Sequence, residues 1–258
     1  RKISTENTQA ALKRFSYRKL SRENRLTYDV LDYYLELSKK ESDYLLYEEP
    51  MGTVSGVQTQ IPVLLSEYQF QSKEDVDAYL ELMKTTPDYF NSLIAFEQEK
   101  AQKGLFMASY TADTVIEQCQ AFIDMGDSNY LISTFVDRIQ KLTDLSESEK
   151  SDYIQKNAYM LKTYVLPAYQ QLIKTVVELK DSGKNEEGLC YLPNGKEYYE
   201  LTVQASTGSA RTVPQLQKLT KNQMKDDLAA MKAVIGLTAE QAKETAVMES
   251  TDPKEILN

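Results

Sequence analysis

The chain has 258 residues, of which 41% are hydrophobic and 27% are charged, proportions that are ordinary for a folded globular protein. Its 39 acidic and 30 basic residues give a net charge of −9, which argues against a nucleic-acid partner, because such a partner requires a basic face. No apolar stretch approaches the roughly 18 residues of a membrane-spanning segment. There is no histidine, so zinc-peptidase, di-iron and Ser-His-Asp or Cys-His mechanisms lack their imidazole.

The first strong helical pattern begins after Ser21, a residue type that caps helix N-termini well. The segment 21–49 is therefore predicted to be an amphipathic helix that ends before Pro50. Its expected apolar face carries Leu26, Val30, Tyr33, Leu37 and Tyr44.

Residues 52–70 are the least helical part of the chain. Gly52, Gly56 and Pro62 interrupt the helical period there. We expect a structured loop that contains a short strand or one helical turn, and this stretch alone leaves room for a short strand pair.

The next two helices are marked by their N-terminal residues. Ser72 and Asp75 form a capping box, and Pro87 suits the first turn of a second helix that runs to Gly104. Because almost nothing separates the two helices, we expect them to pack antiparallel as a hairpin.

Further helices are predicted at 111–125 and 130–142, followed by a long one at 146–180. Ser146 begins the long helix with another capping box. Pro167 lies inside it, so we expect a kink about one turn earlier rather than two separate helices.

A polar break at 181–187 precedes the last part of the chain. Helices are predicted over 195–205, 212–235 and 238–248, the second of them with a capping box at its start. The tail 251–258 is expected to fray.

These patterns predict an all-α fold, a multi-helix array of long antiparallel helices with at most one short strand pair around 52–70. Residues 1–258 would form a single helical domain or lobe, and 181–187 is the possible seam between two. The chain begins with arginine rather than methionine, so we expect it to be a fragment of a longer protein.

Few side-chain patterns carry chemistry. Ser16 and Lys19 match an S-x-x-K motif, but one such match is expected by chance and no partner motif accompanies it. Acidic residues are abundant along the whole chain, so carboxylate pairs are better explained as solvated helix faces than as a glycosidase site. Thr207, Ser209 and Arg211 precede a helix N-terminus and could hold an anion, although an ordinary polar loop explains them better.

The two cysteines indicate neither a disulfide framework nor a zinc site. Cys119 shares an apolar helix side with Ile116 and Phe122, which predicts a buried, inert thiol. Cys190 lies in a loop and is expected to be the more accessible of the two.

The segment GLCYLPNGKEYYE, residues 188–200, stands apart from its helical surroundings. Pro193 and Gly195 indicate a sharp turn, and Tyr198 and Tyr199 follow in the next helix. The 18 tyrosines of the chain could line a sugar or peptide cleft, but packing at the edge of the core with a solvated hydroxyl is their more common role.

The order of motifs in GLCYLPNGKEYYELTVQASTGSARTVPQLQKL resembles the bacterial domain of unknown function 885 family. Its members show a G-L-x-x-L-P-x-G-x-x-Y-Y stretch followed by a Thr-rich loop. Two more segments resemble this family, namely QIPVLLSEYQFQSKEDVDAYLELMKTTPDYFNSLIAFEQEKAQKGLFM and YVLPAYQQLI. The resemblance covers roughly residues 20–235.

That family is similar to helical zinc metallopeptidases, whose H-E-x-x-P-G-H zinc motif lies nearer the C-terminus. This chain departs from the pattern, because it has no histidine and because Ala205 and Ser206 stand where members often have one. The resemblance implies either an N-terminal portion cut before the catalytic half, which the first and last residues favour, or a degenerate, non-catalytic member. It also implies a lipid-anchored or secreted, extracytoplasmic protein of a Gram-positive bacterium.

Two hypotheses follow from the resemblance. In the first, the chain supplies one wall of a peptide cleft, while zinc comes with the missing C-terminal half; this chain itself holds no cofactor, metal ligand or catalytic residue. Its candidate substrate-binding residues are Tyr191, Tyr198, Tyr199 and Arg211. In the second, the chain is a non-enzymatic extracytoplasmic helical binding or interaction module.

Overall fold

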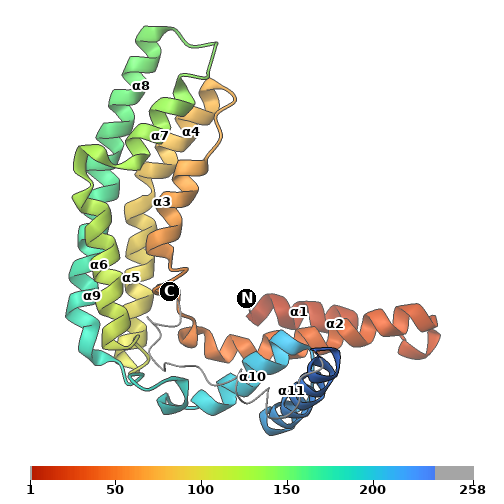
Figure 1. The fold of residues 1–258 in the computed structure, drawn as a ribbon. Helices are drawn as coiled ribbons and strands as arrows, with labels where there is room; N and C mark the ends of the chain where they lie inside the picture. Colours follow the sequence, from red (N-terminus) through yellow and green to blue (C-terminus); the bar gives the residue numbers. More distant parts are fainter. Residues whose placement is uncertain (1, 236–258) are drawn as a thin grey trace. The chain divides into compact units, whose positions relative to one another are not determined.

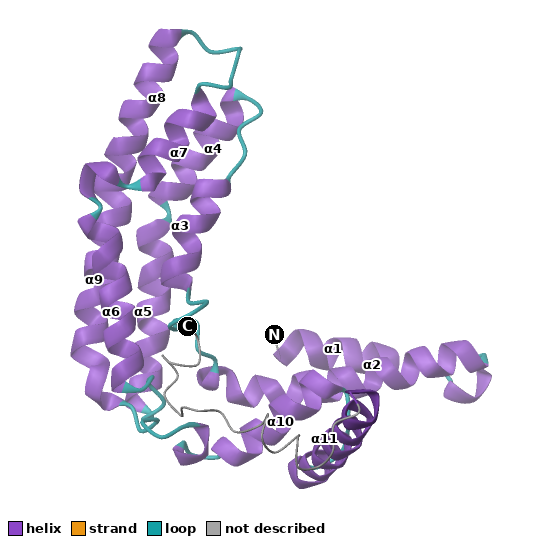
Figure 2. Ribbon diagram, viewed as in Figure 1, coloured by secondary structure: helices purple, strands orange, loops and turns teal. Residues whose placement is uncertain are grey.

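The computed structural model describes residues 2–235, and every regular element in that range is helical, without a strand (Figures 1 and 2). The chain divides into two compact units, Arg1–Tyr199 and Glu200–Asn258. The helix predicted at 238–248 and the tail at 251–258 lie outside the described residues.

The first unit begins with an antiparallel hairpin of two helices, α1 (Lys2–Leu12) and α2 (Arg22–Glu41). Lys39 near the end of α2 pairs with Glu6 near the start of α1, with 3.3 Å between Nζ and Oε1. Sequence reasoning missed α1, a helix in which Thr5 is the one buried residue.

Helix α2 begins where its capping residue predicts. The backbone N–H of Asn24 donates to the Oγ of Ser21 at 3.2 Å. The expected apolar face, in contrast, is buried only in part. Leu37 is buried, but Leu26 and Val30 are 66% and 59% exposed. The helical spacing of apolar residues therefore predicted the helix correctly, but it did not predict which of those residues are buried.

A bundle of four helical rods that alternate in direction follows the hairpin (Figure 1). The rod of α4 and α5 packs against the rod of α8 and α9. The rod of α6 and α7 packs against α8 and α9 as well, and α3 packs against α6 and α7. This confirms the predicted array of long antiparallel helices. The rods are α3 (Val57–Glu67), α4 with α5 (Lys73–Lys84 and Thr86–Gln102), α6 with α7 (Ser109–Asp124 and Tyr130–Ile139), and α8 with α9 (Glu147–Met160 and Leu166–Leu179).

The structured loop and the strand pair expected around 52–70 are both wrong for Val57–Glu67, because these residues form the helix α3. Pro62 cannot donate the backbone hydrogen bond that the carbonyl of Gln58 would receive inside a helix. The hydroxyl of Tyr169 on α9 donates to that carbonyl instead, at 2.6 Å. A proline-containing helix is thus stable here because a distant side chain supplies the missing donor.

The predicted hairpin of α4 and α5 is also wrong, because the two helices follow one another along a single rod (Figure 1). Thr85 between them keeps a right-handed helical conformation, and its N–H donates to the carbonyl of Glu81 at 3.2 Å. Pro87 in the first turn of α5 breaks the hydrogen-bond pattern without reversing the chain. The capping box at Ser72 is present as predicted.

Helices α8 and α9 form one continuous rod, as predicted for 146–180, and the capping box at Ser146 is present. The disturbance expected before Pro167 takes the form of a π-helical segment, Leu161–Val165. Such wide turns are a known way for a helix to absorb an irregularity.

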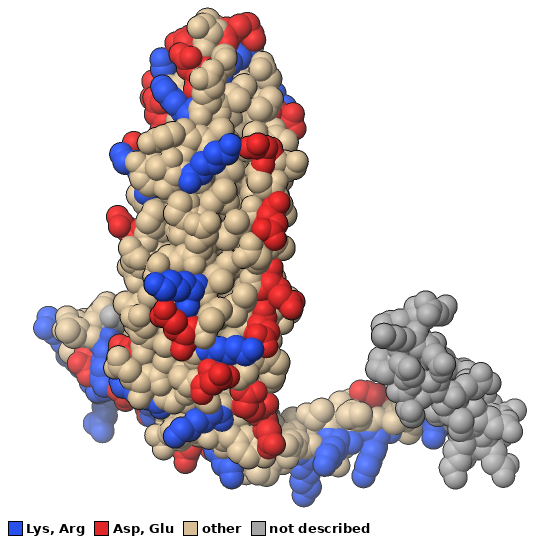
Figure 3. Space-filling model, turned by 90° about the vertical axis from the view of Figure 1, so that its left-hand side faces the viewer, with Lys and Arg blue, Asp and Glu red and all other residues tan. Residues whose placement is uncertain are grey.

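The core lies between the rods and is rich in aromatic side chains. Cys119 is buried in it, as predicted, and burial raises the pKa of its thiol to about 12; Cys190 is exposed. On the face of the bundle shown in Figure 3, acidic and basic side chains are interspersed among uncharged ones. The largest fully buried side chains include Tyr79, Phe90, Phe106, Phe135 and Tyr169.

The last helices are α10 (Gly195–Thr207) and α11 (Val213–Ile235), close to the predicted bounds. Half of the predicted capping box is present, since the N–H of Thr212 donates to Oε1 of Gln215 at 2.9 Å. The segment 181–187 lies within the first unit, and its role as a seam stays a prediction. Of the helices in the described range, none combines the length and apolar character needed to cross a membrane.

Candidate functional site

The segment GLCYLPNGKEYYE forms a tight turn at the start of α10. The N–H of Gly195 donates to the carbonyl of Leu192 at 3.0 Å, which closes a β-turn with Pro193 at its second position. Asn194 has φ of 52°, a region that asparagine tolerates better than most residues. Glycine is required next, because a Cβ at Gly195 would lie 1.8 Å from the carbonyl oxygen of Leu189.

This turn is fixed to an early part of the chain by an aromatic cluster. The ring of Tyr198 stacks on Tyr44 with 5.3 Å between centroids and tilts against Tyr47 at 4.9 Å. Both partners belong to a 3-10 segment, Ser42–Tyr47, that follows α2. The hydroxyl of Tyr47 donates to the carbonyl of Pro193, and burial raises the pKa of Tyr47, so the hydroxyl keeps the proton that it donates.

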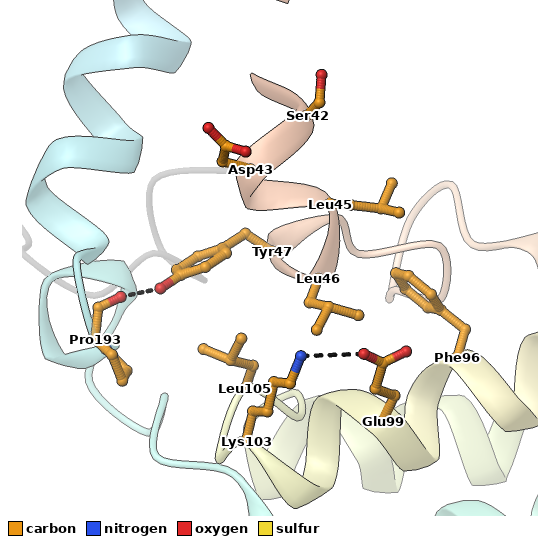
Figure 4. Close-up of a pocket in the computed structure, with 10 residues that line it drawn as sticks. All are labelled: Ser42, Asp43, Leu45, Leu46, Tyr47, Phe96, Glu99, Lys103, Leu105 and Pro193. Atoms are coloured by element: carbon orange, nitrogen blue, oxygen red, sulfur yellow. Dashed lines mark hydrogen bonds and ion pairs between the residues drawn. The ribbon is translucent and has the colours of Figure 1, made fainter. Parts of the chain in front are cut away.

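A cavity of about 470 Å³ lies beside this cluster, between the 3-10 segment, α5 and the turn (Figure 4). Its lining combines an apolar part with polar groups of both charge signs. Such a lining suits a ligand that is itself amphipathic, such as a peptide. The apolar part consists of Leu45, Leu46, Phe96, Leu105 and Pro193, and the polar groups belong to Ser42, Asp43, Tyr47, Glu99 and Lys103.

The charges of the cavity are held loosely. Lys103 and Glu99 form an ion pair at 3.0 Å with side chains that are 55% and 56% exposed, so water screens the pair and either partner can turn to a ligand. Asp43 pairs with Lys2 of α1. The Oγ of Ser42 donates to the carbonyl of Ser38 at 2.8 Å.

A buried charged cluster lies close to the cavity wall, and sequence reasoning missed it. Lys100 on α5 is fully buried, with its Nζ 5.9 Å from the ring centroid of Phe96. It donates to the carbonyl of Glu48 at 2.8 Å and to Oε2 of Glu49 at 3.0 Å. Glu97 lies 3.6 Å away, and burial raises its pKa to about 7 against the opposing effect of Lys100. The cluster ties the chain between the 3-10 segment and α3 to α5.

The four predicted substrate contacts have different surroundings. Tyr198 is half-buried in the aromatic cluster, whereas Tyr191 and Tyr199 are 58% and 51% exposed. Arg211 belongs to the second unit, in the loop before α11, where its N–H donates to Oγ of Ser209 at 3.3 Å. Their role in substrate binding stays a prediction.

The cavity contains residues that sequence reasoning did not single out, above all Tyr47 and Lys103. The spacing of Tyr44 and Tyr47 within one helical turn was a visible signal, but it indicates only that both side chains share one face. Their partner turn lies far along the chain, and no local periodicity reveals such a pairing.

The side chains of residues 2–235 do not fit a zinc site. The sequence has no histidine, and residues 2–235 contain no group of three or more Cys, Asp and Glu side chains placed to hold a metal ion. We therefore assign no metal-dependent step to these residues.

A family model described as "Bacterial protein of unknown function (DUF885)" matches residues 1–257. The chain belongs to the DUF885 family. The resemblance inferred from the sequence is thereby confirmed, and the match extends over both units of this DUF885 chain. A search of curated proteins gave no match.

The DUF885 chain is also similar to a solved structure, the crystal structure of a "putative lipoprotein" from Colwellia psychrerythraea. The TM-score is 0.81 at 13% identity, and the alignment covers 99% of the DUF885 chain and 48% of the other. At this identity the likeness shows the fold alone. The DUF885 chain spans about half the length of that protein.

Proposed function

We propose that this DUF885 chain is the N-terminal, helical, substrate-covering part of a zinc-metallopeptidase-like protein and is not catalytic by itself. The observation that carries the proposal is the cavity beside Tyr47. It has an apolar part and charges of both signs, it is held in shape by the turn that resembles the family pattern, and the hydroxyl of Ser42 in its lining donates to a backbone carbonyl. Such a cavity can hold a peptide side chain without cleaving the peptide.

The length of the similar solved protein supports this division of labour, since about half of that protein lies outside the match. In the proposed parent protein, sequence outside this chain supplies the zinc, its ligands and the general base. The residues of this chain bind and orient the peptide. Lys103 and Asp43 meet its charged groups, and the hydroxyls of Tyr191 and Tyr199 add outer contacts. Arg211, in the second unit, is a further candidate substrate contact that does not rest on the cavity.

The parent gene gives the first test. We expect an H-E-x-x-P-G-H-type motif to be encoded beyond Asn258. A stop codon directly after Asn258 would contradict the proposal. The parent protein should cleave peptides in a zinc-dependent manner, measured by mass spectrometry of the products, whereas the isolated chain should cleave none.

Variants of the parent protein test the cavity itself. Tyr47→Phe removes the hydrogen bond to Pro193 and should raise KM about 10-fold with little change in kcat, because it loosens a binding wall and not the reacting centre. Arg211→Ala should weaken hydrolysis as well. Tyr159→Phe is the matched control, since Tyr159 is 58% exposed on α8. If Tyr47→Phe changes neither KM nor kcat, the cavity is not part of the substrate site.

The alternative is a non-enzymatic helical binding or interaction module outside the cytoplasm. The name of the Colwellia psychrerythraea protein favours a lipid-anchored or secreted location and mentions no reaction. Under this alternative the parent protein cleaves no peptide, yet the isolated chain binds peptides and loses affinity on Tyr47→Phe. Fractionation of cells that express the tagged parent protein tests the location, since recovery in the cytosol contradicts it.

A further inference from the structure

The tip of the α1–α2 hairpin carries a charge pattern opposite to that of the whole chain. Residues 13–25 contain six basic side chains and one acidic one, whereas the full sequence has 30 basic and 39 acidic residues. Figure 1 shows this tip at the right-hand end of the α1–α2 pair. The basic residues are Lys13, Arg14, Arg18, Lys19, Arg22 and Arg25, and all are exposed.

The tip is ordered by its own contacts. Arg25 on α2 spans the turn, with Nε donating to the carbonyl of Tyr17 at 3.3 Å and Nη2 to that of Arg18 at 2.9 Å. Its guanidinium carbon lies 5.6 Å from the ring centroid of Tyr17, and the Tyr17 hydroxyl donates to Asp29 at 2.9 Å. The basic side chains are therefore presented from a defined surface.

The remaining cations of the tip lack acidic partners. Elsewhere on the hairpin the lysines are neutralised, since Lys2, Lys39 and Lys40 pair with Asp43, Glu6 and Glu36. Within the part of the chain that the structure describes, no ion pair involves Lys13, Arg14, Arg18, Lys19 or Arg22. This tip is thus available to an anionic partner.

Apolar side chains stand among these cations. Phe15 in the turn and Leu26 on α2 are 62% and 66% exposed, and neither contributes to the core of the hairpin. Cations next to an exposed aromatic ring are the combination that binds the interface of an anionic bilayer, with phosphates meeting the charges and the ring entering the headgroup region.

We propose that this basic tip, residues 13–26, docks on an anionic phospholipid membrane. A turn between two helices is convex and can meet a flat surface with its exposed basic and aromatic side chains. The net charge of −9 on the whole chain disfavours an extended nucleic acid, which requires a larger basic face. This site is separate from the proposed peptide cavity and does not depend on it.

Co-sedimentation of the full chain with lipid vesicles tests the proposal. The chain should bind phosphatidylcholine vesicles only when they contain phosphatidylglycerol, and binding should weaken as salt is added. The triple variant Arg14→Glu, Lys19→Glu, Arg22→Glu should lower the partition coefficient by on the order of 100-fold. Phe15→Ser should lower it about 10-fold at unchanged charge.

A matched variant separates the tip from overall charge. Lys141→Glu, Lys156→Glu, Lys174→Glu makes the same change of net charge on exposed lysines of the bundle, and should lower binding less than about threefold because distant charges are screened. Circular dichroism checks that each variant keeps its helices. The proposal is overturned if the native chain ignores phosphatidylglycerol vesicles, if the bundle variant loses as much binding as the tip variant, or if the tip binds duplex DNA and not vesicles.

Discussion

The four-rod bundle and the α1–α2 hairpin are built from similar amphipathic helices, yet they bury them very differently. On α4 of the bundle, Val76, Tyr79 and Met83 are all 0% exposed, whereas Leu26 and Val30 on α2 are more than half exposed. Helix α4 packs against α8, and the ring of its Tyr79 also contacts Phe70 and, on α7, Phe135, whereas the main packing partner of α2 is α1. Helical periodicity thus predicts a face, and the tertiary neighbours decide whether that face is buried.

Charged groups follow the same division. The hairpin keeps its ion pairs at the surface, where each contributes little to stability. The bundle encloses the side chains of Lys100 and Glu97, which are 0% and 1% exposed. Each has lost its contact with water, and its interaction with the opposite charge offsets part of that cost. Substitutions in the two regions should therefore differ most where a buried charge is involved.

Lys100→Met should have the largest effect, a loss of about 3–5 kcal/mol in the free energy of unfolding, because it leaves Glu97 and Glu49 without their cation. Urea unfolding followed by circular dichroism measures this. Lys103→Met, an exposed position on the same helix, should change the free energy by less than about 0.5 kcal/mol. Equal effects of the two substitutions would contradict a special role for the buried cluster.

The same cluster predicts a pH dependence. The pKa of Glu97 rises from 4.5 to about 7 in the folded chain, so the folded state holds this proton more tightly than the unfolded state. Stability should therefore fall as pH rises from about 4.5 to 7, by on the order of 2–3 kcal/mol from this group. Urea midpoints across that range should show the fall in the native chain and lose it in Glu97→Gln. Glu99→Gln, at the exposed partner of Lys103, should keep it.

A pair of identical substitutions compares the two regions directly. Val76→Ala in the bundle should cost about 2 kcal/mol, because it removes buried methyl groups and leaves a cavity. Val30→Ala in the hairpin should stay within about 0.5 kcal/mol, because its side chain is already solvated and alanine favours a helix. Thermal unfolding of both variants measures the difference, and similar losses would show that the exposed face of α2 is covered in solution.

A further prediction concerns one hydrogen bond of the bundle. Tyr169→Phe should cost about 1–2 kcal/mol, because the carbonyl of Gln58 loses its donor and Pro62 cannot replace it. Adding Pro62→Ala restores a backbone N–H that can reach this carbonyl, so the double variant should be more stable than Tyr169→Phe alone. A double variant as unstable as the sum of both changes would refute this account of α3.

The features predicted correctly from the sequence are those whose causes are local. The capping boxes at Ser72 and Ser146 depend on residues three positions apart, and the turn at Pro193 and Gly195 depends on its own backbone. The family resemblance likewise rested on the order of short motifs.

The features missed depend on distant partners. A helix through Pro62 requires the hydroxyl of Tyr169, and the rod of α4 and α5 is fixed by packing against α8 and α9. The ring partners of Tyr198, Tyr44 and Tyr47, come from a segment far away in the sequence. Such pairings leave no period that a single sequence displays.

The π-helical segment Leu161–Val165 sets the angular phase of its rod. Tyr153, Asn157, Leu161 and Val165 are buried at intervals of four residues. In an α-helix each such step overshoots a turn by about 40°, so three steps would carry the stripe about 120° around the rod. The π-helical turn offsets this rotation as the insertion of one extra residue would. The buried side of α9 therefore lies on the same side of the rod as the buried side of α8. The side chains of α9 that face the core, Tyr169 among them, therefore owe their direction to a local change of helical pitch.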